Sequence, residues 1–541
     1  MACLTFPWLN PWAAGPSPAV LPWLVTLFCA AWLLGLMPVS ALSLVSVGGV
    51  TLLTLLAGAQ TPSSQVLPIV LAVGILCVFA GTGVHATRDG CVMRPVAGAW
   101  LVAGVLSSAI GLMQYFSIGD VFGSWVNSAR AGEAFANLRQ RNQFASLTNI
   151  ALGALVWLAV SGRSAGRSLW LPLLAASLLA AGNAASSSRT GLLQLVLLCA
   201  LCWVWGGWRQ PVVRRVLLGA VLAYAVATLA LPWLAGLDLM GHGMVARLRA
   251  GDPACASRLT LWSNVLHLIA QKPWFGWRWG ELDYAHYMTL YPGARFCDIL
   301  DNAHNLPLHL AVELGIPLAV AVCGGAGWVV WRARPWRETD PTRQMAWGVL
   351  AVIMLHSMLE YPLWYGPFQM AFGLCVWMLW PAPRERTAGS GQYARASVGA
   401  AIRLAAATAL LAAVAYAAWD YHRISQLYLA PQSRDPAYRD DTLDKVRGSW
   451  LFRNQVLFAE LTTTSLQPAN ARWTFDTATA LLHYSPEPRV IEKVIESAVM
   501  LGRDEDALLH LVRYRAAFPE DYKKWRHTNG LGDPKIDRER D

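Results

Sequence analysis

Polar side chains that could do chemistry interrupt this largely apolar sequence in a few short strings. The strings read Arg139-Gln140-Arg141-Asn142, Ser187-Ser188-Arg189-Thr190, Asn302-Ala303-His304-Asn305 and His356-Ser357-Met358-Leu359-Glu360-Tyr361, and Arg258 and Glu313 stand on either side of the third string. A guanidinium binds phosphate oxygens through two parallel hydrogen bonds and stays charged. An imidazole near neutral pH can take a proton from an attacking hydroxyl. Several arginines with one histidine therefore suit a reaction in which a diphosphate leaves.

The segments between these strings are apolar enough to cross a membrane. Of the 541 residues, 55% are hydrophobic and 14% are charged, whereas a soluble domain carries roughly 25% charged residues. A run of about 20 apolar residues spans the hydrocarbon core, and it must be helical to satisfy its own backbone. We therefore predict an all-α polytopic membrane protein of about twelve transmembrane helices. The predicted spans are 19–38, 41–59, 66–86, 96–116, 144–161, 168–186, 190–208, 216–237, 306–331, 344–360, 364–380 and 398–418.

Arginine clusters alternate between the short loops and predict the orientation of the chain. They are Arg88 and Arg94; Arg163 and Arg167; Arg209, Arg214 and Arg215; Arg332, Arg334, Arg337 and Arg343; and Arg384, Arg386 and Arg395. By the positive-inside rule these loops are cytoplasmic. The candidate strings then face the periplasm, as does the tail from 419. Residues 19–59 carry no charge, so eleven or thirteen crossings remain open. The net charge of +10 is dispersed over the loops, which argues against a nucleic-acid partner.

The chain divides by composition into two parts. We predict a transmembrane domain over 1–418, with one long periplasmic loop at 238–305, and a small helical periplasmic domain over 419–541. In the tail, Val490, Ile491, Val494, Ile495 and Val499 follow helical spacing. A break at Leu501-Gly502-Arg503 within 489–518 predicts a pair of helices similar to a tetratricopeptide-type repeat.

Two of the ten cysteines lie in the predicted long periplasmic loop. The periplasm is oxidising, so we predict a disulfide between Cys255 and Cys297. The alternative is that both thiols are unpaired and packed against the bundle.

Together with Pro273-Trp274-Phe275-Gly276 and Gly280, the strings named above resemble the bacterial protein O-oligosaccharyltransferases of the PglL type. That family shares a Wzy-like superfamily with the O-antigen ligases. The resemblance covers about residues 100 to 380, and its most specific element is the string from His356 to Tyr365. It implies a bundle similar to the glycosyltransferase C class, followed by a helical C-terminal domain.

The resemblance implies a role for individual residues. His304 matches the essential histidine, while Gln140 and Tyr361 match residues of the donor or acceptor site. Arg189 and Arg258 match arginines that bind the lipid diphosphate in the related ligases. Asn302 stands where the family often has a further histidine. Each assignment has a structural alternative, such as helix capping for His304 or an interfacial position for Tyr361. For five further residues the scaffold role is favoured: Arg139, Arg141, Glu313, Glu360 and His356.

The implied reaction moves a preassembled oligosaccharide from undecaprenyl diphosphate to a Ser or Thr hydroxyl of a periplasmic acceptor such as a pilin. We expect it at the bacterial inner membrane, without a cofactor, and without a metal because arginines supply the positive charge. An O-antigen ligase or polymerase, with a lipid-A core or glycan acceptor, is the nearer alternative. A transporter is a more distant one, because its ionisable groups would lie near the bilayer midplane.

Overall fold

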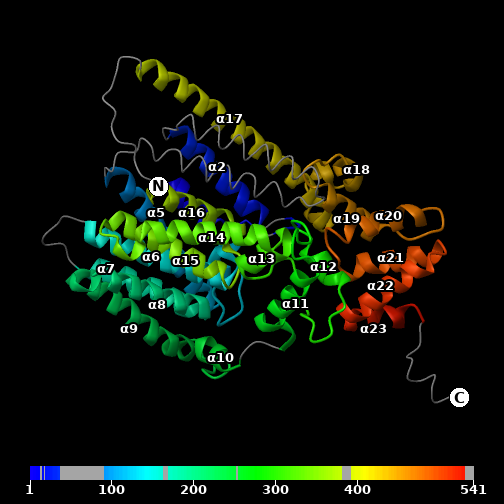
Figure 1. Ribbon diagram of the computed structural model, residues 1–541, viewed down its shortest axis with the longest axis horizontal. Coiled ribbons are helices and arrows are strands. Elements are labelled where there is room, and N and C mark those ends of the chain that lie inside the picture. The colour runs from blue at the N-terminus through cyan, green and yellow to red at the C-terminus, as the bar shows by residue number, and fades with distance from the viewer. Residues whose placement is uncertain are drawn as a thin grey trace. The chain divides into compact units, whose positions relative to one another are not determined.

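A computed structural model describes residues 1–12, 15–17, 19–36, 90–161, 169–250, 254–379 and 392–530 (Figure 1). Throughout these residues the chain forms helices and turns, without a β-strand, which confirms the predicted all-α class. Two compact units can be distinguished among them. The first holds the described residues up to 250 and from 327 to 418, and the second holds 254–326 and the residues from 419 onward.

The first unit is a bundle of mostly apolar helices. They are α1 (Ala2–Leu9), α2 (Val20–Leu36), α5 (Gly90–Tyr115), α6 (Arg141–Ser161), α7 (Trp170–Ala185), α8 (Arg189–Val204), α9 (Pro211–Leu234), α10 (Gly243–Ala250), α15 (Pro341–Ser357), α16 (Gly366–Leu379) and most of α17 (Gln392–Ser425). Small residues let them approach closely. A Cβ atom on Gly104 of α5 would lie 2.3 Å from the Cβ atom of Ala151 on α6. Such small-residue contacts are typical of helix packing in membranes.

Five helices in the described part of the chain are long and apolar enough to span a membrane. They cover Met93–Tyr115, Arg141–Ser161, Pro211–Leu234, Ile316–Arg337 and Arg403–Tyr428. Shorter apolar helices at Val20–Gly35, Trp170–Ala185, Arg189–Val204 and Gly366–Leu379 fall on further predicted spans. The predicted spans 41–59 and 66–86 lie outside the described residues, so the total number of spans stays a prediction.

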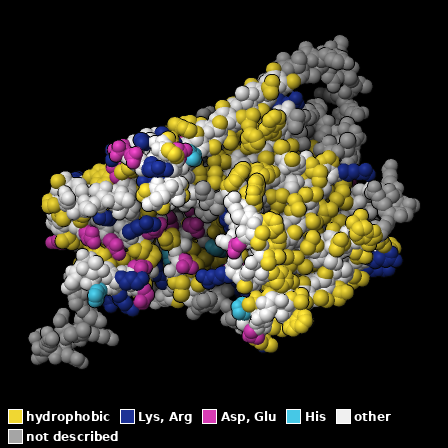
Figure 2. Space-filling view, turned by 180° about the vertical axis from the view of Figure 1, so that it is seen from behind, with side chains coloured by type: hydrophobic (Ala, Val, Ile, Leu, Met, Phe, Trp, Pro, Cys, Tyr) yellow, Lys and Arg dark blue, Asp and Glu magenta, His cyan; other side chains and the backbone are white. Residues whose placement is uncertain are grey.

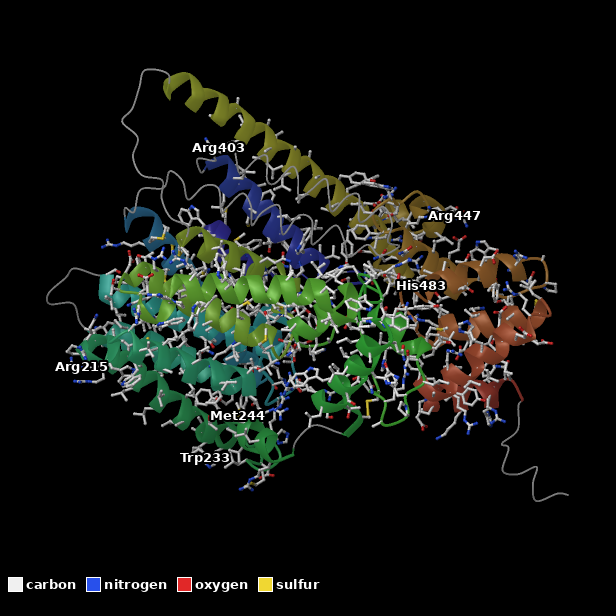
Figure 3. All side chains as sticks on the ribbon, viewed as in Figure 1. Arg215, Trp233, Met244, Arg403, Arg447 and His483 are labelled. Atoms are coloured by element: carbon white, nitrogen blue, oxygen red, sulfur yellow. A yellow bond between two sulfur atoms is a disulfide. The ribbon has the colours of Figure 1, made fainter. Side chains whose placement is uncertain are left out.

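Helix α9 illustrates how charge and aromatic residues mark the ends of a candidate span. Arg215 lies near one end of α9 and Trp233 near the other (Figure 3). Trp favours the headgroup region of a bilayer, and arginines mark the cytoplasmic side. On the face shown in Figure 2, the surface of the first unit is mostly hydrophobic, whereas charged side chains gather on the second unit. A hydrophobic outer surface on these helices is what a membrane protein requires.

The second unit contains the C-terminal helices and much of the segment predicted as one long loop. Its helices are α11 (Arg258–Gln271), α12 (Leu282–Met288), α13 (Leu306–Leu314), the first part of α14 (Ile316–Ala333), α18 (Thr442–Val446), α19 (Arg453–Thr463), α20 (Ala471–Leu481), α21 (Pro488–Met500), α22 (Asp504–Ala517) and α23 (Pro519–Thr528). The prediction of a long periplasmic loop over 238–305 between two spans stays a prediction. The segment contains helices, and it is divided between the units.

The predicted span 306–331 is not one continuous helix in the structure. Gly315 separates α13 from α14 and has a φ of +88°. A Cβ atom at this position would lie only 2.1 Å from the carbonyl oxygen of Trp274. The break is therefore caused by close backbone contact with another segment, which the hydropathy of the sequence does not reveal.

The predicted helix pair in the tail is present as α21 and α22, with Gly502 at a φ of +68° between them. Val490, Ile491, Val494 and Ile495 are buried, as their spacing predicts. Val499 is instead 58% exposed, because it lies in the last turn of α21, beyond the packed face.

Helix α12 packs against the C-terminal helices, so the second unit joins segments far apart in the sequence. Tyr287 is buried in the same hydrophobic core as residues of α21 and α22. Its hydroxyl is 2.9 Å from Nδ1 of His510. The Glu281 carboxylate lies 2.6 Å from Nδ1 of His483, whose ring stacks on Tyr284 with centroids 3.8 Å apart. These contacts join the segment before His304 to the C-terminal helices as one folded body.

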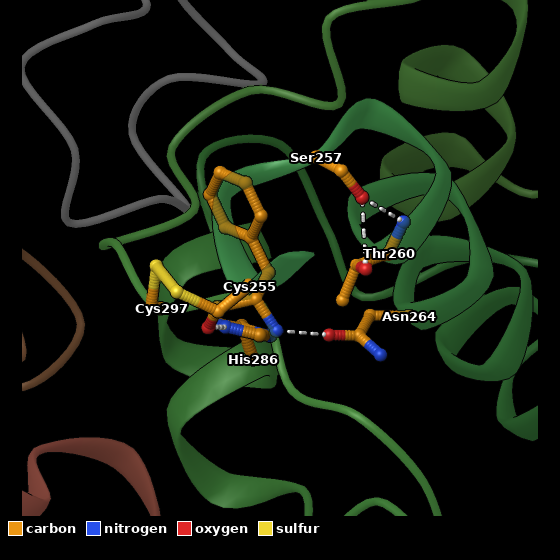
Figure 4. Close-up of a disulfide and its surroundings, with 7 residues drawn as sticks. Cys255, Ser257, Thr260, Asn264, His286 and Cys297 are labelled. Carbon is orange, nitrogen blue, oxygen red and sulfur yellow. Dashed lines mark hydrogen bonds between the residues drawn. A yellow bond between two sulfur atoms is a disulfide. The ribbon is translucent and has the colours of Figure 1, made fainter. Parts of the chain in front are cut away.

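Cys255 and Cys297 form a disulfide in the second unit, with Cα atoms 5.3 Å apart (Figure 4). Hydrogen bonds fix the chain next to Cys297. Asn264 of α11 accepts from the backbone N–H of Phe296 at 2.8 Å. His286 contacts the carbonyl oxygen of Phe296 through Nε2 at 3.2 Å. Burial, reinforced by the charge of Arg295, lowers the pKa of His286 to about 3, so its ring is neutral and donates one hydrogen bond here.

We expect Cys255 and Cys297 to resist alkylation when the purified, non-reduced protein is denatured. A disulfide leaves no thiolate to react, and this one closes a loop of 42 residues, for which chain-entropy estimates give about 4 kcal/mol of stabilisation. Peptide mass spectrometry would measure the labelling, with the free thiols of Cys29 and Cys375 as the positive control. Both loop cysteines recovered as labelled thiols would contradict the bridge.

Candidate functional site

The candidate residues are divided between the two units. Gln140, Arg189, Tyr361 and the support residues Arg139, Arg141, His356 and Glu360 belong to the first unit. His304, Arg258, Glu313 and the two bridged cysteines belong to the second.

In the first unit, three strings distant in sequence meet through the side chain of Asn142. Its Nδ2 atom donates to the Glu360 carboxylate at 3.1 Å, and its Oδ1 atom accepts from the Ser188 hydroxyl. The Ser188 Oγ atom in turn accepts from the N–H of Gly191 at 2.9 Å and caps α8. Arg189 is the first residue of that helix and is half-buried. Asn142 therefore connects the start of α6, the start of α8 and the end of the string that carries Tyr361.

A helix N-terminus suits an anion. The first N–H groups of α8 have no partner within the helix, and its dipole is positive at this end. Arg189 adds a full positive charge there. The start of α8 can therefore attract a phosphate group, as the sequence suggests for Arg189.

The remaining candidates of the first unit have well-defined local contacts. The Gln140 side-chain oxygen accepts from the N–H of Gln143 at 2.6 Å and thus caps α6. The Tyr361 ring stacks on Tyr365, with centroids 6.0 Å apart. Arg139 donates to the carbonyl oxygen of Pro11 at 2.7 Å, and Arg141 pairs with Glu133. These contacts connect Arg139 to the backbone at Pro11 and Arg141 to the carboxylate of Glu133.

His356 lies at the centre of a buried polar network rather than at the surface. It is fully buried, and its Nδ1 atom lies 2.9 Å from the hydroxyl of Ser146. Ser146 also accepts from Gln194 at 2.8 Å, and Gln194 donates to the carbonyl oxygen of Val352 at 3.1 Å. Unpaired polar groups are costly in an apolar interior. These hydrogen bonds pair polar groups of α6, α8 and α15 and so join the three helices. The contacts fit the scaffold role favoured for His356.

In the second unit, His304 lies in a tight turn directly before α13. Its φ is +49°, and its N–H donates to the Asn302 side chain at 2.9 Å. Asn305 caps α13 by accepting from the N–H of Leu308 at 3.1 Å. The two asparagines of the string therefore fix the backbone on both sides of His304, while the His304 side chain remains partly exposed.

Arg258 is held near the His304 turn by α11. Arg258 is the first residue of α11, after the capping residue Ser257. Trp262 lies one turn further on the same face, and its indole N–H donates to the carbonyl oxygen of Ala303 at 3.1 Å. The arginine and the histidine therefore lie on neighbouring elements that are joined directly. Burial raises the pKa of the Asp301 carboxyl, and the nearby His304 opposes this rise.

Glu313 lies at the far end of α13 and is buried. Its carboxylate lies 3.5 Å from Nε2 of His309 and receives the backbone N–H groups of Gly280 and Leu282. These contacts connect α13 to the turn before α12, which fits the scaffold role favoured for Glu313.

The structure identifies Asn142, Ser188 and Asn305 as residues that position the candidate side chains. The sequence contains one signal for them, because all three stand inside the polar strings. Their individual hydrogen-bond partners could not be deduced, since Glu360 is 218 residues away from Asn142.

A cavity of about 270 Å³ lies in the first unit, away from the candidate residues. It is lined by the C-terminal halves of α6 and α8, including Trp157 and Cys202, by Trp205 directly after α8, and by Gln344 of α15. Arg141 and Arg189 stand at the opposite ends of α6 and α8. This cavity is therefore distinct from the polar site at the helix starts.

The contact between Asn142 and Glu360 predicts a specific rescue. Asn142→Asp should destabilise the first unit by about 1–3 kcal/mol, because two carboxylates would then face each other without a donor between them. Adding Glu360→Gln should restore most of the lost stability, since the new amide at position 360 can donate to the new carboxylate at position 142. Thermal unfolding of the detergent-solubilised variants measures both effects. Equal stability of the single and double variants would show that this hydrogen bond contributes nothing.

Three family models match parts of the chain. Residues 174–323 match the O-antigen ligase family, 134–159 match a protein glycosylation ligase, and 344–530 match the C-terminal part of a virulence-factor membrane-bound polymerase. The ligase match contains Arg189, Arg258 and His304. These matches confirm the resemblance to the superfamily of O-antigen ligases and protein O-oligosaccharyltransferases.

Individual relatives agree with this class. A general O-oligosaccharyltransferase of Acinetobacter baylyi (strain ATCC 33305 / BD413 / ADP1) is 25% identical over 298 residues, which are 53% of this chain and 50% of the relative. The ComP-specific O-oligosaccharyltransferase of the same strain is 23% identical over 311 residues, 56% of this chain and 54% of the relative. The chain thus spans about half the length of these relatives. No solved structure matches it.

Proposed function

We propose that this protein is an oligosaccharyltransferase that moves a preassembled oligosaccharide from undecaprenyl diphosphate to a Ser or Thr hydroxyl of a periplasmic acceptor protein, such as a pilin. The observation that carries the proposal is the position of the three chemically suited residues. Arg189, Arg258 and His304 all fall within the O-antigen ligase match, and each is fixed at the start of a helix or directly before one. The match of residues 134–159 to a protein glycosylation ligase favours a protein acceptor over a lipid.

In the proposed reaction, the oxygen of the acceptor hydroxyl forms a bond to the anomeric carbon of the glycan. The bond from that carbon to the diphosphate oxygen breaks, and undecaprenyl diphosphate leaves with the bonding electrons. His304 accepts the hydroxyl proton or orients the hydroxyl for attack. Arg258 and Arg189 stabilise the charge that develops on the diphosphate, because guanidinium groups bind phosphate oxygens bidentately. Gln140 and Tyr361 shape the donor site.

An O-antigen ligase or polymerase remains the alternative, because the match over 344–530 is to a polymerase. The two functions differ in the acceptor. The chain can be produced in a bacterial host that makes an undecaprenyl-diphosphate-linked oligosaccharide and lacks its own transferase, together with a candidate pilin. Mass spectrometry would then detect glycan on Ser or Thr of the pilin. Glycan found on the lipid-A core or on longer glycan chains, with unmodified periplasmic proteins, would support the alternative.

A further inference from the structure

Two large hydrophobic side chains of the second unit face outward on the turn between α11 and α12. Trp274 is 71% exposed and Phe275 is 88% exposed, which places both among the most exposed large apolar residues in the described chain. Side chains of this size normally contribute to a core or to an interface. Their exposure therefore needs an explanation.

Flexibility does not explain it, because the turn is fixed on both sides by backbone contacts. The N–H of Ile316 donates to the carbonyl oxygen of Pro273, and the N–H of Trp277 donates to that of Val312, both at 2.8 Å. Gly276 has a φ of +65°, and a Cβ atom there would lie 2.4 Å from the backbone of Glu313. The string Pro273-Trp274-Phe275-Gly276 is thus a rigid turn that packs against the junction of α13 and α14.

The turn is fixed at the residue where a candidate membrane span begins. Helix α14 starts at Ile316, and its apolar window is only 6% buried. Leu318, Val320 and Val322 of this helix are exposed, so lipid is the environment that suits its surface. The hydrogen bond from Ile316 to Pro273 places Trp274 and Phe275 beside the first turn of the span.

Charged residues flank the aromatic pair. Lys272 and Arg278 are both exposed, and the Lys272 ammonium lies 3.8 Å from the centroid of the Trp277 ring. Tryptophan and phenylalanine with adjacent cations match the boundary between phosphate headgroups and acyl chains. A docking site for a protein partner would not have to lie at the start of a span, whereas a contact with the membrane surface would.

We infer that the turn at Pro273–Gly276 is a membrane-interface anchor, in which Trp274 and Phe275 insert between phospholipid headgroups beside the start of α14. The anchor also sets the position of the His304 turn. Helix α13, whose nine residues rise about 14 Å, separates the His304 turn from the anchored end. A lipid-linked diphosphate would be presented at the same headgroup level. The anchor itself does not depend on the proposed reaction.

Site-specific photo-crosslinking in native membranes tests the anchor. p-Benzoylphenylalanine replaces Phe275, and adducts are identified after irradiation by mass spectrometry of the purified protein. The probe at Val320 of α14 is the control for a lipid-facing position, and the probe at Leu508 of α22, 61% exposed, is the matched control in the same unit. We expect phospholipid adducts at 275 at a yield comparable with 320, and none at 508.

A protein adduct at position 275, or no adduct there while position 320 captures lipid, would overturn the anchor. Equal lipid capture at 508 would overturn it as well, because the turn would then be no different from the rest of the unit. The disulfide between Cys255 and Cys297 serves as the folding check for each labelled protein. The readout is independent of glycan transfer, so an inactive protein could still show the anchor, and an active one could lack it.

Discussion

The His304→Ala variant is expected to insert and accumulate normally and to lose glycan transfer by roughly 100- to 10,000-fold, the range for removal of a general acid–base group. The imidazole is the group proposed to accept the acceptor proton, and the partly exposed side chain leaves room for an acceptor. Quantitative mass spectrometry of the acceptor measures the loss. Near-normal glycosylation by this variant would remove His304 from the mechanism.

A second substitution separates chemistry from backbone conformation. His304 has a φ of +49°, a region that asparagine tolerates better than alanine. His304→Asn should therefore keep the turn but lose transfer to the same extent. His304→Gln adds a test of mechanism, because partial activity would indicate orientation of the hydroxyl rather than proton transfer. Formation of the disulfide between Cys255 and Cys297 confirms folding of the second unit in each variant.

Replacing either diphosphate arginine by lysine should reduce transfer by about 10- to 100-fold, which corresponds to the loss of one charge-assisted hydrogen bond. Lysine keeps the charge of Arg189 or Arg258 but cannot present two parallel donors to a phosphate. Initial rates at limiting and saturating donor would show whether the loss lies in binding or in the chemical step.

Arg453 provides the matched control, because it is also the first residue of its helix, α19, and it is exposed. Arg453→Lys should leave transfer unchanged. If both Arg189→Lys and Arg258→Lys were as active as the original protein, the two arginines would act only as surface charge.

The sequence predicted those features that depend on local composition. Apolar runs indicated the helices of the first unit, and the spacing of Val490, Ile491, Val494 and Ile495 indicated the packed face of α21. The pairing of Cys255 with Cys297 followed from the small number of cysteines in one predicted loop. The helix predictions needed only residues that are close in sequence. The disulfide prediction needed only the fact that the predicted loop contains two cysteines.

Features that depend on distant contacts could not be predicted. The break at Gly315 is caused by the backbone of Trp274, and the junction at Asn142 needs Glu360, so neither is visible in a local window. The same limit applies to the candidate site. The sequence proposed His304, Arg189 and Arg258 by residue type and by resemblance to a family, whereas the asparagines and the serine next to them could be assigned only from hydrogen bonds.

The packing of α12 against the C-terminal helices also has a consequence for synthesis of the protein. Tyr287 and its partner His510 are 223 residues apart, and translation adds about 5–20 residues per second, so the partner arrives roughly 10 to 45 seconds later. During that interval the apolar face around Tyr287 is uncovered. A chain cut short before α22 would keep this face exposed, and we expect cellular proteases to remove it rather than let it persist as an inactive protein.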